Sequence, residues 1–334
     1  QLLERLPQSN WNTKMETKIN RIEKQNQSLL EEESNESKFF NLIKPIVKKA
    51  KYSTITMACL LDRFTFDCFS REINLIPVTK SNWKTVLSRS DIDYLLVESI
   101  WTGHDGGWRF AMSSFKTPAG DQLRELLKYC KSSQIKTIFW NKEDPVNYES
   151  FIDVAKHFDY IFTSDKNSIQ RYEKDCKNSI ISSLPFAAQP VIHNPIRNSL
   201  PEHDICFAGS WYVRDHGKRK YYTKLLIDAS SNYGLHIFDR FHGTDNRNRF
   251  PSEYDDFVKG SLSYKETCMA YRAYKIFLNI NSVDQSPTMF SRRVFEILAS
   301  STALVSTPSS GMEKLLGNCI YVVDSEENAK NTNT

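Results

Sequence analysis

Two arginines and one glutamate lie close together in the segment SPTMFSRRVFE, residues 286–296. The guanidinium groups of Arg292 and Arg293 can clamp phosphate oxygens, and the Glu296 carboxylate can accept hydrogen bonds from ribose hydroxyls. An ordinary Arg–Glu pair at helical spacing on a solvated face is the alternative. The chemistry that these residues indicate is binding of a nucleoside diphosphate.

The same segment predicts the helix that positions these side chains. Ser286 is a favourable N-cap, and Pro287 suits the first helical position, so we expect a helix to begin there. Its free N–H groups would face an anion, with both arginines in the next turn. Asn281 directly follows the strand expected before this helix.

A second group of polar and aromatic residues is expected at the carboxyl ends of two other strands. The loop WTGHDGGWR, residues 101–109, holds three of the eleven glycines and follows an apolar strand, and residues 141–144 end the next one. Open α/β sheets bind ligands at this edge, and tryptophan faces suit sugar rings. The alternatives are a tight turn with half-buried indoles and ordinary turn material. The candidate acceptor and sugar residues are Trp101, Gly103, Gly106, Trp108, Arg109, Asn141 and Lys142.

A third motif is FAGSWY, residues 207–212, at the end of a further strand. Gly209 lacks a side chain, so a diphosphate could approach the backbone there, with Ser210 beside it. Arg219 follows within a basic run that could supply countercharge, although such runs at helix starts are usually solvated.

Together with FWNKEDP at 139–145, these motifs resemble the spore-maturation CgeB-like glycosyltransferases, which are two-domain GT-B enzymes. The resemblance extends from about residue 51 to the last residues. It implies that the donor nucleotide lies on the second domain, with ribose on Glu296 and diphosphate on Arg219 and on Arg292 or Arg293. Many relatives carry a second glutamate where this chain has Thr288, which puts the usual sugar-ring contact in doubt. The donor-site candidates are Gly209, Ser210, Arg219, Asn281, Thr288, Arg292, Arg293 and Glu296.

The reaction implied is transfer of a sugar from a nucleoside-diphosphate sugar. The resemblance favours UDP as the nucleotide. Fixed positive groups at the departing diphosphate are its main requirement, so no metal or other cofactor is expected. With retention of configuration, which the relatives favour, the leaving phosphate takes the acceptor's proton; with inversion a carboxylate must do so. The candidate catalytic residues are His104, Asp105, Glu143 and Asp144.

Other functions use the same residues differently. A GT-B sugar-nucleotide 2-epimerase would eliminate and re-add the diphosphate in the same cleft, and a non-catalytic sugar-nucleotide-binding or scaffold protein would only bind. The dehydrogenase hypothesis fails because no G-x-G-x-x-G follows a strand. A nucleic-acid binder is disfavoured because basic and aromatic residues are not interleaved.

The elements that must position these residues follow from alternating apolar runs and amphipathic stretches, which predict an α/β protein with two Rossmann-like domains. We expect residues 1–50 to be a helical extension, 51–188 the acceptor domain and 189–334 the donor domain, cut short at its C-terminus as part of a longer protein. A proline-rich linker spans 184–195. The expected strands are 54–60, 75–78, 94–97, 137–140, 160–163 and 180–184, then 204–208, 235–238, 276–280, 303–305 and 320–323.

Four apolar residues and one asparagine recur in the N-terminal extension at spacings of four, three, four and three residues: Met15, Ile19, Ile22, Asn26 and Leu29. This pattern predicts a short coiled-coil seam that would make a homo-oligomer, or else an amphipathic helix packed on its own domain.

Composition agrees with an ordinary globular protein. The 334 residues are 40% hydrophobic and 25% charged, and the net charge of +4 is too small to indicate nucleic-acid binding. Seven cysteines without a CxxC pair favour a reducing cytoplasm, and membrane contact would be peripheral, at the inner face. The expected partners are a nucleotide-sugar donor and a glycan, cell-surface polymer or protein acceptor, as in polysaccharide biosynthesis.

Overall fold

A computed structural model describes residues 50–331 except 104–105, 198–199, 201, 213–217 and 244–247. The described residues belong to one compact unit that runs from Ala50 to Thr334. The helical extension and coiled-coil seam predicted for residues 1–50 therefore lie outside the described residues, apart from Ala50. They stay predictions.

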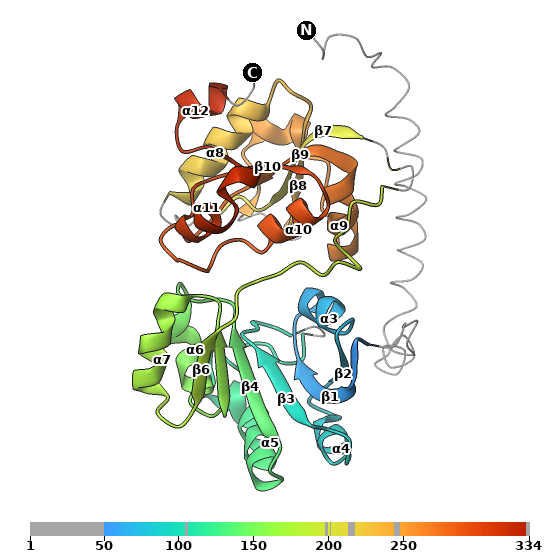
Figure 1. Ribbon diagram of the computed structural model, residues 1–334, viewed down its shortest axis with the longest axis vertical. Coiled ribbons are helices and arrows are strands. Elements are labelled where there is room, and N and C mark those ends of the chain that lie inside the picture. Colours follow the sequence, from blue (N-terminus) through green and yellow to red (C-terminus); the bar gives the residue numbers. More distant parts are fainter. Residues whose placement is uncertain are drawn as a thin grey trace. The chain divides into compact units, whose positions relative to one another are not determined.

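The first sheet has six parallel strands in the order β2-β1-β3-β4-β5-β6 (Figure 1). The strands are β1 Tyr52–Leu60, β2 Ile73–Pro77, β3 Tyr94–Glu98, β4 Lys136–Asn141, β5 Tyr160–Thr163 and β6 Ile180–Ser183. The helices between them are α3 Arg63–Phe69, α4 Trp83–Leu87, η1 Pro118–Gly120, α5 Asp121–Ser132, α6 Tyr148–Ala155, η2 Lys166–Ser168 and α7 Ile169–Asp175.

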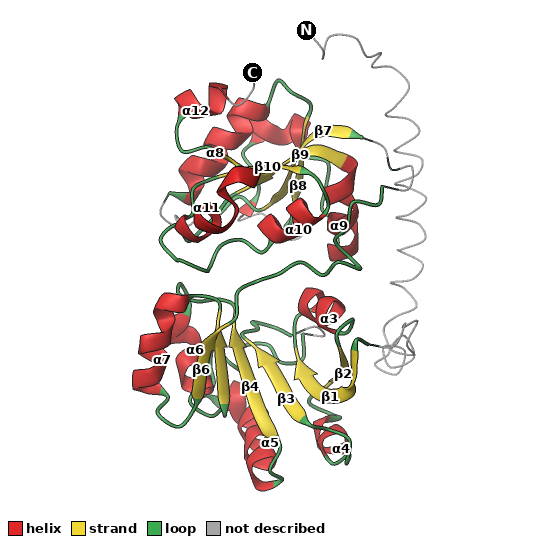
Figure 2. Ribbon diagram, viewed as in Figure 1, coloured by secondary structure: helices red, strands yellow, loops and turns green. Residues whose placement is uncertain are grey.

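The second sheet has five parallel strands in the order β11-β10-β9-β7-β8. The strands are β7 His203–Gly209, β8 Leu235–Asp239, β9 Tyr274–Asn279, β10 Ala303–Ser306 and β11 Tyr321–Val322. Its helices are α8 Arg219–Ser230, η4 Ser252–Phe257, α9 Tyr264–Ala273, α10 Arg293–Ala299, α11 Ser310–Leu316, η5 Gly317–Cys319 and α12 Glu326–Asn331. Figure 2 shows the strands of each sheet flanked by helices.

The predicted α/β fold with two Rossmann-like sheets is confirmed. Each predicted strand corresponds to an observed one, because strands buried on both faces read as short apolar runs. In both sheets the first strand lies between the second and the third. The second strand is therefore added on one side of the first, and the third on the other side, next to β1 in one sheet and β7 in the other. Such a change of side is the switch point at which open α/β sheets bind ligands.

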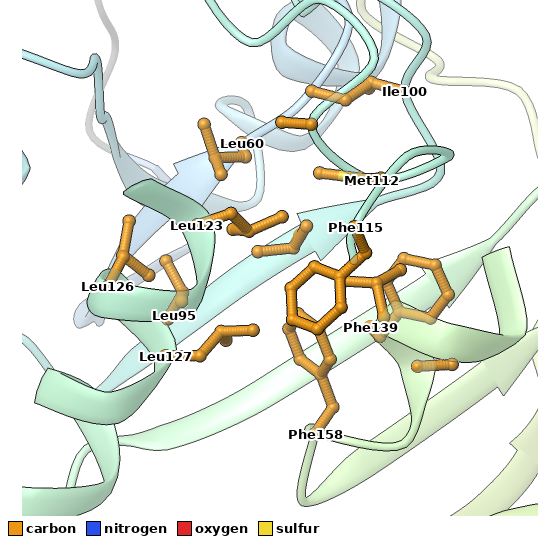
Figure 3. Packing of buried hydrophobic residues seen from close by; sticks show 14 of the residues in the cluster. Leu60, Leu95, Ile100, Met112, Phe115, Leu123, Leu126, Leu127, Phe139 and Phe158 are labelled. Carbon is orange, nitrogen blue, oxygen red and sulfur yellow. The ribbon is translucent and has the colours of Figure 1, made fainter. Parts of the chain in front are cut away.

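Helix α5 shows how the first sheet is covered. Leu123, Leu126 and Leu127 recur at helical spacing and are buried, in one hydrophobic cluster with Leu95 of β3 and Phe139 of β4 (Figure 3). Burying large side chains of this kind contributes about 1.5–3 kcal/mol each. The loops at the carboxyl ends of the strands are therefore held on a rigid support.

The described residues between β6 and β7 form neither helix nor strand, as expected of a linker. The boundary predicted after residue 188 falls in this segment. Gln189 is nevertheless buried, and its Nε2 donates to the Cys68 carbonyl at 3.2 Å and to Glu72 Oε1 at 2.9 Å. In the part of the chain that the structure describes, no helix is long and apolar enough to cross a membrane.

Candidate functional site

The candidate site is a cavity of about 430 Å³ at the carboxyl ends of strands from both sheets. From the first sheet it is lined by residues that follow β1 and β3. From the second it is lined by residues at the ends of β7 and β8, around the start of α9, and at the start of α10, which follows β9. Both switch points therefore face one cavity, of a size typical for a small-molecule ligand. The lining residues are Asp62, Arg63, Phe64, Gly103, Ala208, Gly209, Phe238, Arg240, Leu262, Tyr264, Thr267, Arg292 and Arg293.

The helix that carries the arginines begins later than predicted. Helix α10 starts at Arg293 with Arg292 as its N-cap, so a start at Ser286 and Pro287 is wrong. Ser286 Oγ still accepts from the N–H groups of Thr288 and Met289, at 3.3 and 2.8 Å. These bonds close a local serine turn, which uses the same pattern as a helix cap without continuing into a helix.

Asn281 positions this turn and does not line the cavity. Its Oδ1 accepts from Ser291 N at 3.0 Å, and its Nδ2 donates to the Thr307 carbonyl at 2.9 Å. The side chain is buried and hydrogen-bonded on both sides. The structure thus places Asn281 as a support for the backbone just before Arg292.

Positive charge is concentrated at the cavity. Arg63, Arg240, Arg292 and Arg293 line it, and no ion pair within the described chain joins Arg240 or Arg293 to a carboxylate. Burial lowers the pKa of Arg293, and the neighbouring Arg240 and Arg292 lower it further. Burial likewise lowers the pKa of Arg219 to about 10, with added repulsion from Arg293 and Arg240. An anion in this cavity would relieve that repulsion.

Arg219 lies beside the cavity rather than on its wall. Its guanidinium donates to the Ile280 carbonyl at 3.1 Å and to Ser282 Oγ at 2.8 Å, and it stacks over the Tyr212 ring at 4.9 Å. Its Nε finds no hydrogen-bond partner among the described residues. A direct contact between Arg219 and a diphosphate stays a prediction.

Gly209 lines the cavity at the end of β7, as predicted. A Cβ at this position would come within 2.6 Å of the Phe207 ring, so packing also demands glycine here. The next residue, Ser210, is buried, and its Oγ has no hydrogen-bond partner among the described residues. Such unpaired buried groups are rare and call for a ligand or water.

Glu296 is buried within a network instead of facing the cavity. It is 2% exposed, and Oε1 accepts from the Arg292 guanidinium, while Oε2 accepts from Tyr271 Oη at 2.9 Å. Tyr264 Oη donates to Oε1 at 3.3 Å, and His193 Nε2 lies 3.5 Å from it. Although burial alone raises the pKa of Glu296, Arg292 and the other donors bring it below the ordinary value. Its role as a ribose ligand stays a prediction.

Thr288 joins the two sheets and does not line the cavity. Its Oγ1 accepts from Lys166 N at 2.9 Å and donates to the Ser164 carbonyl at 2.8 Å, both just after β5. Ser286 Oγ adds a bond of 2.6 Å to Asp165 Oδ1. The structure therefore replaces the predicted donor contact of Thr288 with a structural contact between two loops.

We expect Thr288→Val to lower the free energy of unfolding by about 1–3 kcal/mol, because a backbone N–H and a carbonyl lose their partner. Nucleotide affinity should change less than about twofold, which is a negligible free energy. Urea unfolding and calorimetry measure the two quantities. The exposed Thr85→Val, on α4, is the matched control, and a large loss of affinity with unchanged stability would contradict this assignment.

Only part of the glycine-rich loop, residues 101–109, lies at the cavity. Gly103 lines it, and both Gly103 and Gly106 have positive φ, at 78° and 73°, which glycine adopts without strain. Trp108 is fully buried, and its Nε1 donates to the Val78 carbonyl at 3.0 Å, so a sugar contact for Trp108 is wrong. Trp101 and Arg109 are exposed, and their acceptor role stays a prediction. His104 and Asp105 lie outside the described residues.

The polar residues at and after the end of β4 find their hydrogen-bond partners within the first sheet's half of the protein. Asn141 Nδ2 donates to Asp144 Oδ1 and to Tyr172 Oη, both at 2.8 Å, and both residues are fully buried. Glu143 Oε2 accepts from Asn147 Nδ2 at 2.9 Å. None of these residues lines the cavity, because their side chains complete a buried polar turn. The structure does not bring the predicted catalytic pair, Glu143 and Asp144, to the cavity.

The buried carboxyl group of Asp144 should make the stability of the protein depend on pH. Burial raises its pKa from 3.8 to about 7, although hydrogen bonds from Thr163 and Tyr172 oppose the shift. The folded state thus retains a proton that the unfolded chain loses near pH 4, so stability should fall as pH rises from about 4 to about 7. We expect Asp144→Asn to flatten this part of the profile of unfolding free energy against pH, and the exposed Asp256→Asn to leave it unchanged. An unaltered slope in Asp144→Asn would contradict the assignment.

Lys142 is buried in an ionic cluster that the sequence did not reveal. Its Nζ contacts Asp62 Oδ2, lies 3.2 Å from Glu98 Oε1, and sits 4.2 Å from the centre of the Phe64 ring. Burial raises the pKa of Glu98, with the Lys142 charge opposing it. Lys142 therefore does not line the cavity, but it contacts Asp62 and Phe64, which do.

Asp62, Arg63, Phe64 and Arg240 are cavity residues that sequence reasoning missed. The first three begin the segment after β1, and Arg240 follows β8. A signal was present, because charged residues directly after an apolar strand belong to the ligand-binding edge of a parallel sheet. As for metals, the described residues contain no cluster of three or more His, Cys, Asp or Glu side chains that could hold an ion.

Comparisons with known proteins give one match to a family model. Residues 195–332 match a family model described as glycosyl transferase-like. The match confirms a glycosyltransferase-like domain in the C-terminal part of the chain, which contains Gly209 and the arginines of the second sheet. The CgeB-like family stays a prediction. No curated protein matches the chain.

Solved structures give only distant likenesses. A sucrose-phosphate synthase from Thermosynechococcus elongatus is 10% identical, with a TM-score of 0.46 over 83% of this chain and 88% of that one. AviGT4, a glycosyltransferase involved in avilamycin A biosynthesis, is 12% identical, with a TM-score of 0.43 over 83% of this chain and 88% of that one. The N-terminal domain of a Candida albicans trehalose-6-phosphate phosphatase is 11% identical, with a TM-score of 0.44 over 86% and 90%. Nothing about function follows from likenesses this weak.

Proposed function

We propose that the protein is a glycosyltransferase that takes a sugar from a nucleoside-diphosphate sugar bound in the cavity. The observation that carries the proposal is the set of four arginines lining a cavity at the switch points of two Rossmann-like sheets. The glycosyltransferase-like match of residues 195–332 supports it, since that segment supplies Arg240, Arg292 and Arg293.

The leaving group of such a reaction is a diphosphate, and its departure gives the anomeric carbon oxocarbenium character. Guanidinium groups fixed near the departing oxygens stabilise this transition state more than the ground state. The arginines can supply that charge directly, so we propose transfer without a divalent ion. Gly209 lines the cavity, so we propose that the diphosphate lies beside the backbone there, and Ser210 Oγ offers an unpaired hydroxyl on the next residue.

UDP is the nucleotide that we propose, and the acceptor is a glycan, cell-surface polymer or protein. Stereochemistry depends on which group takes the proton from the acceptor hydroxyl. The leaving phosphate would give retention, which the resemblance favours, and a carboxylate on the acceptor side would give inversion. A homo-oligomer through the N-terminal extension and a cytoplasmic location stay proposals as well.

Calorimetric titration of the purified chain with UDP, GDP, ADP and dTDP, with and without magnesium, tests this function. We expect one nucleotide to bind with a Kd that magnesium does not change. Binding that requires magnesium would contradict the metal-independent proposal. No binding by any of the four would remove the glycosyltransferase proposal and favour a scaffold role.

A further inference from the structure

The cavity has one acidic residue among its described lining residues, Asp62. It lies between β1 and α3 of the first sheet's half, whereas Arg240, Arg292 and Arg293 lie in segments that follow strands of the second sheet. Among the described lining residues, a single carboxylate thus accompanies cationic, apolar and neutral polar groups, and it comes from the half expected to bind the acceptor.

The Asp62 carboxylate is held firmly on one side and open on the other. Oδ2 accepts from Lys142 Nζ, and the backbone N–H of Asp62 donates to Glu98 Oε1. Lys142 is itself fixed by Glu98 at 3.2 Å, and Glu98 accepts from Thr65 Oγ1 at 2.7 Å. No hydrogen bond from the described chain reaches Asp62 Oδ1, and the side chain is 33% exposed. One oxygen is therefore oriented by the protein, and the other is available to a ligand.

The Phe64 ring contacts both the lysine that holds this carboxylate and the arginine that would face the diphosphate. Lys142 Nζ lies 4.2 Å and Arg292 Cζ lies 4.0 Å from the centre of that ring. The same aromatic ring thus contacts the partner of Asp62 and the guanidinium at the start of α10. A sugar in the cavity would have the arginines toward its leaving group and Asp62 toward the acceptor.

We propose that Asp62 is the catalytic base of the reaction and that transfer therefore inverts configuration, in contrast to the retention that the resemblance favours; this inference rests on the proposed function. As the acceptor oxygen bonds to the anomeric carbon, its hydroxyl proton passes to Asp62 Oδ1. The bond from the anomeric carbon to the phosphate oxygen breaks, and its electron pair leaves with the diphosphate. Asp62 then releases the proton to solvent.

Donor cleavage by water tests the proposal without knowledge of the acceptor. The probes are UDP-glucose, UDP-N-acetylglucosamine, GDP-mannose, ADP-glucose and dTDP-glucose, all α-linked. For the donor cleaved fastest, nucleotide release gives the rate, and proton NMR gives the anomer formed before the free sugar mutarotates. We expect the wild-type protein to release the β-anomer.

Asp62→Asn is expected to slow cleavage by about 100-fold or more, which is within the usual contribution of a positioned base. The Kd of the nucleotide should stay within about twofold, because this side chain does not contact the leaving group. Asp91→Asn, a surface aspartate paired with Arg89, is the matched control and should cleave at the wild-type rate.

The outcomes separate the two proposals. Release of the α-anomer, or full activity in Asp62→Asn, would overturn the role of Asp62 and leave glycosyl transfer intact. Binding of the donor without cleavage would also overturn it, since a base at the acceptor site should activate water. Failure of every nucleotide to bind would overturn the proposed function itself. The anomer released by the wild-type protein decides the matter even if Asp62→Asn folds poorly.

Discussion

Arg293→Ala is expected to weaken binding of UDP, or of whichever nucleotide the chain prefers, by at least about 100-fold. Arg293 lines the cavity at the first turn of α10, and its guanidinium donates to the Ala208 carbonyl next to Gly209. That bond holds the charge beside the place where a diphosphate would approach the backbone. Charge-assisted bonds to phosphate are among the strongest that a protein makes, so their loss should dominate the change in Kd.

The free protein should lose little stability in the same variant. Burial and the charges of Arg240 and Arg292 lower the pKa of Arg293, which shows that its charge is disfavoured in the folded protein. Calorimetry gives the Kd and urea unfolding gives the stability. The control is Arg89→Ala, at an exposed ion pair away from the cavity. Equal affinities in Arg293→Ala and the wild-type protein would contradict an anion site at these arginines.

The strands could be predicted from sequence because their signal is local. The run Tyr160–Thr163 was expected with the bounds that β5 has, and the shifts elsewhere amount to a residue or two. Apolar runs of this length between polar turns are typical of strands in a parallel sheet with helices on both faces. Gly209 could be placed at the cavity because it ends a strand at the ligand-binding edge. Arg292 and Arg293 were predicted from a helix start at Ser286 that the structure does not have, and they line the cavity at the start of α10.

Residues whose roles depend on tertiary contacts could not be placed from sequence. The Ser286 turn has the hydrogen-bond pattern of a helix cap, and only its contact with Asp165 shows that it joins two loops instead. The sequence around Trp108 fits either a side chain that contacts a sugar or one that packs in the core. The sequence places Asp62 after a strand, but the contacts that fix its carboxylate come from Lys142 and Glu98, which are distant in sequence.

Glu296→Ala is expected to lower the free energy of unfolding by about 3–5 kcal/mol, because it leaves the Arg292 guanidinium partly buried without its carboxylate. The glutamate also accepts from Tyr271 and Tyr264, whose hydroxyls would lose a partner. Urea unfolding measures the loss, and the exposed Glu125→Ala on α5 is the control, with a change within about 0.5 kcal/mol.

The double variant Arg292→Met with Glu296→Leu separates a structural role from a ligand role. Replacing both members of a buried ion pair by apolar side chains of similar volume is often neutral or stabilising, so we expect most of the lost stability to return. Nucleotide binding should not return with it, because Arg292 lines the cavity. If Glu296→Ala instead keeps full stability and loses nucleotide affinity, Glu296 contacts the ribose, and its ion pair with Arg292 must open when the donor binds.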